Sequence, residues 1–348
     1  MSKNKSHIKK SKKSKKSKKS SVIDPQYFSS LVNLGNDYVS KGEFDLAIEQ
    51  YNKALAIDPK HAGILANLGN AYAGKGEFDL AIEQYNKALV IDPKHAGILA
   101  NLGNAYAGKG EFDLAIEQYN KALAIDPNYV DVLVNLGNVY ARKSEFNLAI
   151  EQYNKALAIN PNYVDALVNL GNAYDREGEF DLAIEQQNKV LAIDPTYVNA
   201  LVNLGNAYSN KGEFDLAIKQ YNKVLAIDTK RVDTLVNLGN VYARNDKFNL
   251  AIEQYNKALA INPKHINALF NLGNAYSEKD DFDLAIEQYN KVLAIDTKRV
   301  DTLVNLGNVY ARNGKFNLAI EQYNKALAIN PKHINALVNF GKVNAEKD

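Results

Sequence analysis

A spacing of 34 residues constrains this chain more than any other feature. Glycine recurs at that interval along almost the whole sequence, and all eight prolines fall at a single register of the same repeat. The ten glycines are Gly35, Gly69, Gly103, Gly137, Gly171, Gly205, Gly239, Gly273, Gly307 and Gly341. A period of this length is typical of an array in which each unit stacks on its neighbours, so we expect one elongated solenoid.

One repeat, residues 62–95, shows what each unit should form. Two apolar patterns of helical period lie on either side of a break at Lys75-Gly76, where glycine readily supplies a turn. The residues that share one side of their helix are Leu65, Leu68, Gly69 and Tyr72 in the first and Phe78, Ala81, Tyr85, Ala88 and Leu89 in the second. A single helix pair cannot cover its own apolar face, so neighbouring pairs must stack.

This signature resembles the tetratricopeptide repeat, whose period is also 34 residues. The residues that carry the resemblance are Leu65, Leu68, Gly69, Tyr72, Ala81, Tyr85, Ala88 and Pro93. One departure is leucine where the family often has tryptophan, since the chain has no tryptophan. The resemblance covers residues 28–348 and implies an all-α fold, a right-handed superhelical α-solenoid of antiparallel helix pairs.

The repeat register divides the chain into four parts. Residues 1–21 are rich in lysine and serine and are expected to be disordered, and residues 22–27 look like the end of a vestigial repeat. Nine full repeats occupy 28–333, and 334–348 should form a C-terminal capping helix. The full repeats begin at Phe28, Ala62, Ala96, Val130, Val164, Val198, Val232, Ile266 and Val300.

The net charge of +2 conceals a division along the chain. Residues 1–21 contain ten lysines and no acidic residue, so the rest of the chain has a net charge of −8. Such a segment could tether the protein to nucleic acid, an anionic membrane or a nuclear-import receptor, or only keep it in solution. The lysines that would make this contact include Lys9, Lys10, Lys12, Lys13, Lys15, Lys16, Lys18 and Lys19.

Composition also limits the compartment and the chemistry. The chain has no cysteine, which fits a reducing compartment and leaves neither disulfides nor a thiol nucleophile. No apolar run approaches the roughly 18 residues of a membrane span, and the basic start lacks the apolar core of a signal peptide. We therefore expect a cytoplasmic protein, or a nuclear one if the source is eukaryotic.

No residue pattern indicates catalysis, a cofactor or a metal. There is no G-x-S-x-G, phosphate-binding loop or dinucleotide fingerprint. His61, His95, His265 and His333 share one position between repeats. Stacked helices lie roughly 8 to 10 Å apart, whereas zinc ligands must each reach within about 2.1 Å of one ion, so adjacent copies should not converge. We expect a protein that is not an enzyme.

Two columns of asparagine supply the candidate binding surface. In the fifth repeat Asp165, Asn169, Asn172 and Arg176 lie opposite the core side of the first helix. This stripe would line the concave face if the family geometry holds. The first column is Asn33, Asn67, Asn101, Asn135, Asn169, Asn203, Asn237, Asn271, Asn305 and Asn339; the second is Asn36, Asn70, Asn104, Asn138, Asn172, Asn206, Asn240, Asn274 and Asn308.

A primary amide offers one acceptor and two donors, which suits the main chain of an extended peptide. The columns resemble the asparagine ladder in the repeat domain of O-linked N-acetylglucosamine transferase, which implies peptide binding. The alternative is ordinary family consensus, satisfied by neighbouring helices. Five rungs at about 0.5 to 1.5 kcal/mol each fall short of the roughly 8 kcal/mol of a micromolar complex. Selectivity should therefore come from the charged ends of the stripe, where Asp131, Asp165, Asp233 and Asp301 accompany Arg142, Arg176, Arg244 and Arg312.

The sequence thus predicts a protein-interaction scaffold that binds an extended peptide, with two alternatives left open. One is attachment to nucleic acid or an anionic surface through the lysine segment. The other is a non-catalytic subunit of a larger enzyme or sensor complex. Within the array, Gln187 replaces tyrosine and Val190 replaces alanine at positions expected to be packed. We expect residues 164–197 to form the least stable repeat.

Overall fold

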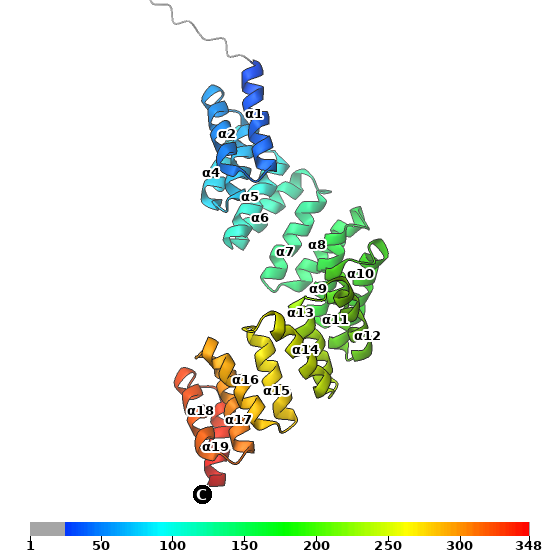
Figure 1. The fold of residues 1–348 in the computed structure, drawn as a ribbon. Coiled ribbons are helices and arrows are strands. Elements are labelled where there is room, and N and C mark those ends of the chain that lie inside the picture. Colours follow the sequence, from blue (N-terminus) through cyan, green and yellow to red (C-terminus); the bar gives the residue numbers. More distant parts are fainter. Residues whose placement is uncertain (1–24, 348) are drawn as a thin grey trace, which may run out of the picture. The chain divides into compact units, whose positions relative to one another are not determined.

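The structure is a computed structural model that describes residues 25–347 and contains only helices and short connections in that range (Figure 1). The predictions for residues 1–21 lie outside the described part of the chain. The helices are α1 (Pro25–Ser40), α2 (Phe44–Ile57), α3 (Ala62–Gly74), α4 (Phe78–Ile91), α5 (Ala96–Lys109), α6 (Phe112–Ile125), α7 (Val130–Arg142), α8 (Phe146–Ile159), α9 (Val164–Glu177), α10 (Phe180–Ile193), α11 (Val198–Lys211), α12 (Phe214–Ile227), α13 (Val232–Arg244), α14 (Phe248–Ile261), α15 (Ile266–Glu278), α16 (Phe282–Ile295), α17 (Val300–Arg312), α18 (Phe316–Ile329) and α19 (Ile334–Lys347).

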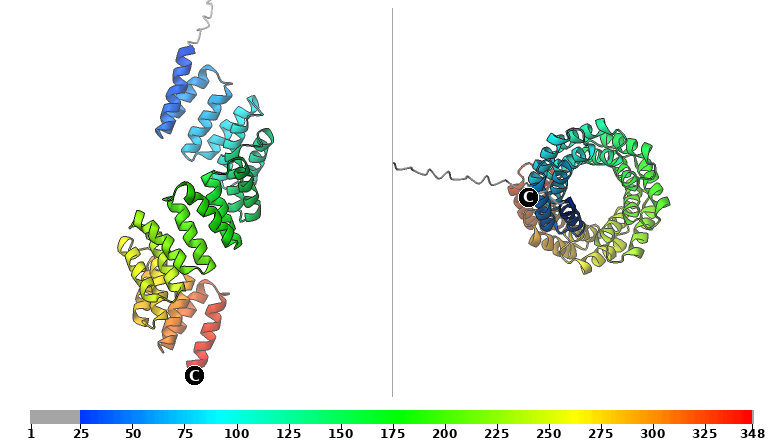
Figure 2. Two further views of the ribbon diagram at one scale, coloured as in Figure 1. Left: turned by 90° about the vertical axis from the view of Figure 1, so that its right-hand side faces the viewer. Right: turned by 90° about the horizontal axis from the view of Figure 1, so that it is seen from above.

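The helices divide between two compact units, Met1–Pro127 and Asn128–Asp348. The first unit contains α1 to α6 and the second contains α7 to α19. Within each unit every helix packs against the helices that precede and follow it, so helix pairs stack side by side (Figure 2). This arrangement confirms the all-α solenoid of helix pairs that the sequence predicts.

A close contact between glycine and tyrosine explains the 34-residue period. A Cβ atom placed on Gly69 would lie 2.6 Å from Cε1 of Tyr85, which no real side chain tolerates. Tyr85 is 1% exposed, so its ring fills the space that the missing side chain leaves. The same contact recurs in most other repeats. Glycine in the first helix and tyrosine in the second are therefore two halves of one packing unit.

The turn inside each repeat lies where the sequence places it. In the second repeat α3 ends at Gly74 and α4 begins at Phe78, and Gly76 between them has a φ of +77°. Three repeats place an ordinary residue at this left-handed position, with φ values of 62° at Ser144, 54° at Asp246 and 61° at Asp280. Aspartate is among the residues that tolerate this conformation best.

The histidines between repeats cap helices. Nδ1 of His95 accepts a hydrogen bond from the backbone N–H of Ile98 at 3.2 Å, in the first turn of α5. His61, His265 and His333 make the same bond at the starts of α3, α15 and α19. The first N–H groups of a helix have no acceptor four residues earlier in it, so these side chains supply one; the N–H of Ile98 also lies 3.1 Å from the carbonyl oxygen of His95.

The fifth repeat differs from its neighbours at one buried position. Gln187 replaces the packed tyrosine and is 1% exposed. Its Nε2 donates to the carbonyl oxygen of Val168 at 3.1 Å, but its Oε1 is buried without a hydrogen-bond partner. Val190 is fully buried beside Leu167 and Ala200. Both positions are packed, as predicted, and lower stability of this repeat stays a prediction.

The last described helix keeps an apolar outer face. In α19, Ile334 is 73% exposed, and Leu337 and Val338 are each 48% exposed. A capping helix normally presents polar residues to water. Lys342 and Asn344 stand where the preceding repeat has Asn308 and Tyr310, and they do not make the outer face polar.

Candidate functional site

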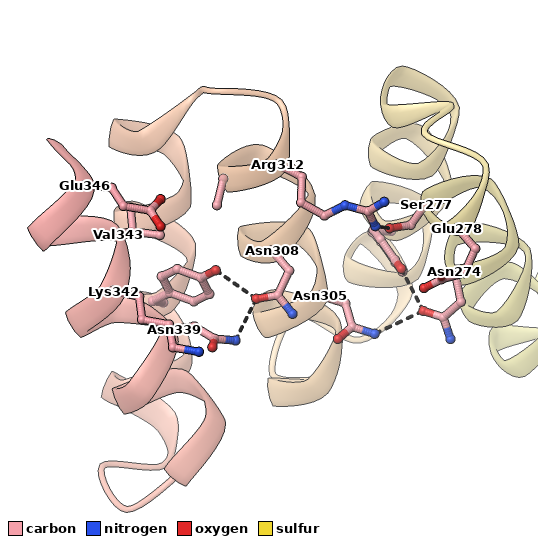
Figure 3. Close-up of a pocket in the computed structure, with 13 residues that line it drawn as sticks. Asn274, Ser277, Glu278, Asn305, Asn308, Arg312, Asn339, Lys342, Val343 and Glu346 are labelled. Carbon is pink, nitrogen blue, oxygen red and sulfur yellow. Dashed lines mark hydrogen bonds between the residues drawn. The ribbon is translucent and has the colours of Figure 1, made fainter.

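The two asparagine columns are hydrogen-bonded to each other. Oδ1 of Asn308 accepts one bond from the hydroxyl of Tyr323 and one from Nδ2 of Asn339, each at 2.8 Å (Figure 3). Asn274 accepts from Tyr289 at 2.7 Å and from Asn305 at 3.0 Å. Each second-column amide thus joins the tyrosine of its own repeat to the first-column amide of the next.

This linkage recurs along both units, with informative exceptions. The first-column donors are Asn67, Asn101, Asn169, Asn271, Asn305 and Asn339, and their acceptors are Asn36, Asn70, Asn138, Asn240, Asn274 and Asn308. Asn135 also has a partner. Asn206 accepts from Tyr221 at 2.6 Å, whereas Asn172 has no tyrosine because Gln187 occupies that position. The side-chain amides of Asn203 and Asn237 form no hydrogen bond within the part of the chain that the structure describes.

The bonds between the columns use only some of the hydrogen-bond donors and acceptors of the side-chain amides. A second-column Oδ1 is occupied by two donors, but its NH₂ group keeps both N–H donors. A linked first-column amide has donated one N–H and keeps the other together with its Oδ1. Asn203 and Asn237 keep their whole capacity. The columns therefore help to hold adjacent repeats together and still present donors and acceptors.

The amides line three hollows in the second unit, which together run along α13, α15, α17 and α19. The first hollow, about 670 Å³, is lined by residues that include Asn274, Asn305, Asn308 and Asn339 (Figure 3). The second, about 460 Å³, and the third, about 320 Å³, share Asn240 and Asn271. These volumes are of the size that holds small ligands or a few side chains. We call this surface, together with the amide of Asn203 one repeat earlier in the same column on α11, the asparagine groove.

The arginines predicted to flank the amides lie in the last turns of their helices. Arg142 and Arg176 end α7 and α9. Arg176, like Asp165 at the start of α9, forms no ion pair among the described residues and is exposed. Arg244 and Arg312 end α13 and α17 and line the second and first hollows. The structure thus brings Arg244 and Arg312 together with the amides in these hollows.

Arg244 and Arg312 are held in place by the same two contacts. Nη1 of Arg244 donates to Oγ of Ser209 at 2.7 Å, and its guanidinium lies 5.3 Å from the centre of the Phe214 ring. Arg312 has the matching contacts with Ser277 at 3.0 Å and with the ring of Phe282 at 5.3 Å. A guanidinium over an aromatic face is attracted by the ring quadrupole, so both side chains are oriented before any ligand arrives.

Near the starts of α13 and α15 the groove carries two residues that were not predicted from the sequence, Phe270 and Arg299. Phe270 replaces the small residue found at this position in other repeats, and the guanidinium of Arg299 lies 5.1 Å from the centre of its ring. Nε2 of His265 lies 3.6 Å from Oδ1 of Asp233. All four line the third hollow. In the sequence, the phenylalanine at position 270, where the other repeats have alanine or valine, was the one feature that could have indicated this contact.

A tyrosine at the end of the fourth repeat bonds to the first helix of that repeat. The Tyr163 hydroxyl donates to Oδ1 of Asp131, one of the charged residues predicted at the ends of the stripe. This hydrogen bond, together with desolvation, raises the pKa of Tyr163 to about 12. Asp131 is therefore less available to a peptide than Asp165, which lies one repeat further on.

No group of three or more metal-ligating side chains comes together between residues 25 and 347. No helix in that range is long and apolar enough to cross a membrane.

Family comparisons agree with the repeat geometry. A family model described as TPR repeat matches residues 35–76, 72–110 and 103–144. Models described as Tetratricopeptide repeat match 129–196, 198–230, 230–298 and 300–333. No curated protein matches the chain.

Solved structures include similar arrays. A tetratricopeptide repeat protein from Parabacteroides merdae has 22% identity and a TM-score of 0.56, over 72% of this chain and 99% of that one. MamA has 33% identity over 48% of this chain and 91% of its own, with a TM-score of 0.43. YrrB, described as a TPR protein with an unusual peptide-binding site, has 26% identity over 53% of this chain and 95% of its own, with a TM-score of 0.43. The family models span most of residues 35–333, and the chain belongs to the tetratricopeptide repeat family.

Proposed function

We propose that the protein is an interaction scaffold that binds an extended segment of another protein in the asparagine groove. The amides of Asn203, Asn237 and Asn271 come from consecutive repeats and would bind the main chain of the segment. Side chains at the two ends of the groove, Arg244 and Arg299 among them, would select which segment binds.

The observation that carries this proposal is the unused hydrogen-bonding capacity of the amides around the hollows. Asn271 and Asn305 each donate one N–H to the preceding repeat and keep a free Oδ1. An extended peptide has unpaired N–H and C=O groups along its edges, and each needs a partner when water is displaced. The internal bonds also fix the amides, which lowers the entropic cost of ordering them on binding.

The internal bonds also set a limit on affinity. Each remaining amide contributes about 0.5 to 1.5 kcal/mol net, so main-chain contacts alone give a weak complex. A micromolar complex needs about 8 kcal/mol, and the difference must come from side chains of the guest. We therefore expect broad recognition of extended segments, sharpened by a few charged or aromatic contacts.

The test uses peptides selected against the full chain from a library of random sequences. Replacing Asn203 and Asn237 by alanine removes two amides that make no internal hydrogen bond, so the fold should be unaffected. The expected loss is about 2 kcal/mol, or roughly 30-fold in Kd. Asn222 and Asn256, exposed on the second helices, provide the matched control when both are replaced by alanine. Equal affinities for the two double variants would rule out the groove.

The lysine segment stays a separate proposal, based on charge alone. Deleting residues 1–21 removes ten positive charges and leaves all described helices intact. If the segment tethers the protein to a polyanion, the deletion should abolish that binding, and the logarithm of the native affinity should fall steeply with the logarithm of salt concentration. Peptide binding in the groove should be the same with and without the segment.

A further inference from the structure

Two matching arginines, which lie in identical stretches of the array, differ in one ion pair. Residues 221–245 are identical to residues 289–313, so Arg244 and Arg312 occupy the same place in the repeat. Both donate to a serine hydroxyl and lie over a phenylalanine ring of the preceding repeat. In each case the following repeat places a glutamate in the same register, Glu278 after Arg244 and Glu346 after Arg312.

The difference lies in the turn of the preceding repeat. Nη2 of Arg312 donates to Oδ1 of Asp280 at 2.6 Å. The residue that matches Asp280 in the other copy is Gly212, which has no side chain. Arg244 has no carboxylate within 4.0 Å among the residues described. It is thus oriented like Arg312 but keeps the donors that Arg312 directs to an acid.

We propose that Arg244 binds a glutamate or aspartate side chain of the extended peptide. At Arg312 the carboxylate of Asp280 already occupies the matching position, so a guest carboxylate cannot bind there. The inference rests on the proposed function of the groove and adds the chemical class of the guest residue. Arg244 lines the 460 Å³ hollow together with Asn240, Asn271 and Asn274. A guest whose main chain follows the amides therefore passes the guanidinium, and Asp280 shows how a carboxylate meets this side chain.

The electrostatics of the hollow agree with a single acidic residue in the guest. A planar guanidinium presents paired N–H donors that match a carboxylate, and contact with an aromatic ring leaves its edge open for them. Glu278 lines the same hollow and is a like charge to the incoming acid. Glu278 therefore weakens the binding of one guest carboxylate and disfavours a guest that carries two. Replacing Glu278 by glutamine should therefore strengthen binding of the acidic peptide.

The test exchanges the residue at this turn position, Gly212 or Asp280, between the two repeats. Gly212→Asp places a carboxylate beside Arg244, and Asp280→Gly removes the one beside Arg312. Gly212 has a φ of +86° and Asp280 a φ of 61°, so aspartate is already accepted at this turn. The probe is the blocked peptide acetyl-Ser-Gly-Ser-Glu-Ser-Gly-Ser-amide, and its control has glutamine in place of glutamate. The chain contains six arginines, which makes their Nε–H signals resolvable by NMR in the full-length protein.

In the native chain the glutamate peptide should shift the Arg244 signal, leave Arg312 unchanged and bind about fivefold more tightly than the glutamine peptide. Gly212→Asp should abolish the shift and the fivefold preference. Asp280→Gly should make Arg312 respond as Arg244 does. The inference is overturned if Arg244 and Arg312 respond alike in the native chain, or if both peptides shift Arg244 equally.

The side-chain amide signals of Asn203 and Asn237 separate this inference from the function on which it rests. If both peptides shift these signals and neither shifts Arg244, the groove binds peptides and the assignment of Arg244 is wrong. If the glutamate peptide shifts Arg244 while the amides stay unchanged, the carboxylate site exists without the asparagine groove. If neither peptide shifts any of these signals at millimolar concentration, both proposals fail.

Discussion

Replacing Gln187 by tyrosine should stabilise the fifth repeat. The tyrosine ring would pack against Gly171, as Tyr221 packs against Gly205 one repeat later. Its hydroxyl would reach Asn172, the second-column asparagine of the same repeat. The helix α12, which contains Tyr221, also has valine three residues further on, so Val190 should accept the ring.

The size of the effect follows from the hydrogen bonds that change. The substitution removes the unpaired Oε1 of Gln187, whose burial costs about 1 to 3 kcal/mol. It adds a bond from the tyrosine hydroxyl to Asn172 and loses the bond from Nε2 to Val168, each about 0.5 to 1.5 kcal/mol, so these nearly cancel. We expect the fifth repeat to gain about 2 kcal/mol, which slows its amide exchange roughly 30-fold.

Hydrogen exchange followed by mass spectrometry measures this change repeat by repeat. In the native chain the amides of residues 164–197 should exchange faster than those of the repeats on either side. In Gln187→Tyr the exchange rates of the three repeats should be equal. The matched control, Tyr221→Gln added to Gln187→Tyr, should transfer the weak point to residues 198–231. Unchanged or faster exchange of residues 164–197 in Gln187→Tyr would show that the unpaired oxygen does not limit stability.

Three further changes test the packing, the caps and the buried tyrosines. Gly69→Ala should lower the free energy of unfolding by about 1 to 3 kcal/mol, because its Cβ would meet the ring of Tyr85; Gly341→Ala, whose Cβ meets nothing within 4 Å, should be neutral or stabilising in urea titrations. His95→Ala should cost about 1 kcal/mol by removing a cap on α5, and an unchanged urea midpoint would refute this. Burial raises the pKa of Tyr323 to about 12 from an ordinary value near 10, so its contribution to stability should be complete below pH 10 and disappear as the pH rises through 12. Tyrosinate absorbance should then rise together with unfolding, and titration of every tyrosine near pH 10 in a folded chain would contradict the packing.

The fold could be predicted because every local preference repeats at one period. Gly69 and Tyr85 lie 16 residues apart, and their partnership follows from stacking two amphipathic helices whose apolar faces are already visible in the sequence. The break at Gly76 is equally visible, since glycine marks the left-handed turn. Packing faces and turns are properties of one repeat, and one repeat is enough to derive them.

The bonds between repeats could not be predicted from one repeat. The pairing of Asn339 with Asn308 depends on how far one helix pair is rotated against the next, which a helical projection does not contain. The contrast between Arg244 and Arg312 depends on Gly212 and Asp280, 32 residues before each arginine. Histidine is not a preferred capping residue, so the role of His95 was visible only in the structure.

The most direct test of the scaffold is a comparison of two ligands that differ only in their main chain. A peptide selected against the groove is synthesised with normal amides and again with ester bonds at the residues facing Asn203, Asn237 and Asn271. An ester lacks the N–H donor and has a weaker carbonyl acceptor, while every side chain is kept. If the amides bind the main chain, the ester analogue should lose about tenfold or more in affinity for the native chain and little for the variant with Asn203 and Asn237 replaced by alanine. Equal affinity of both ligands for the native chain would contradict main-chain recognition by the asparagine groove.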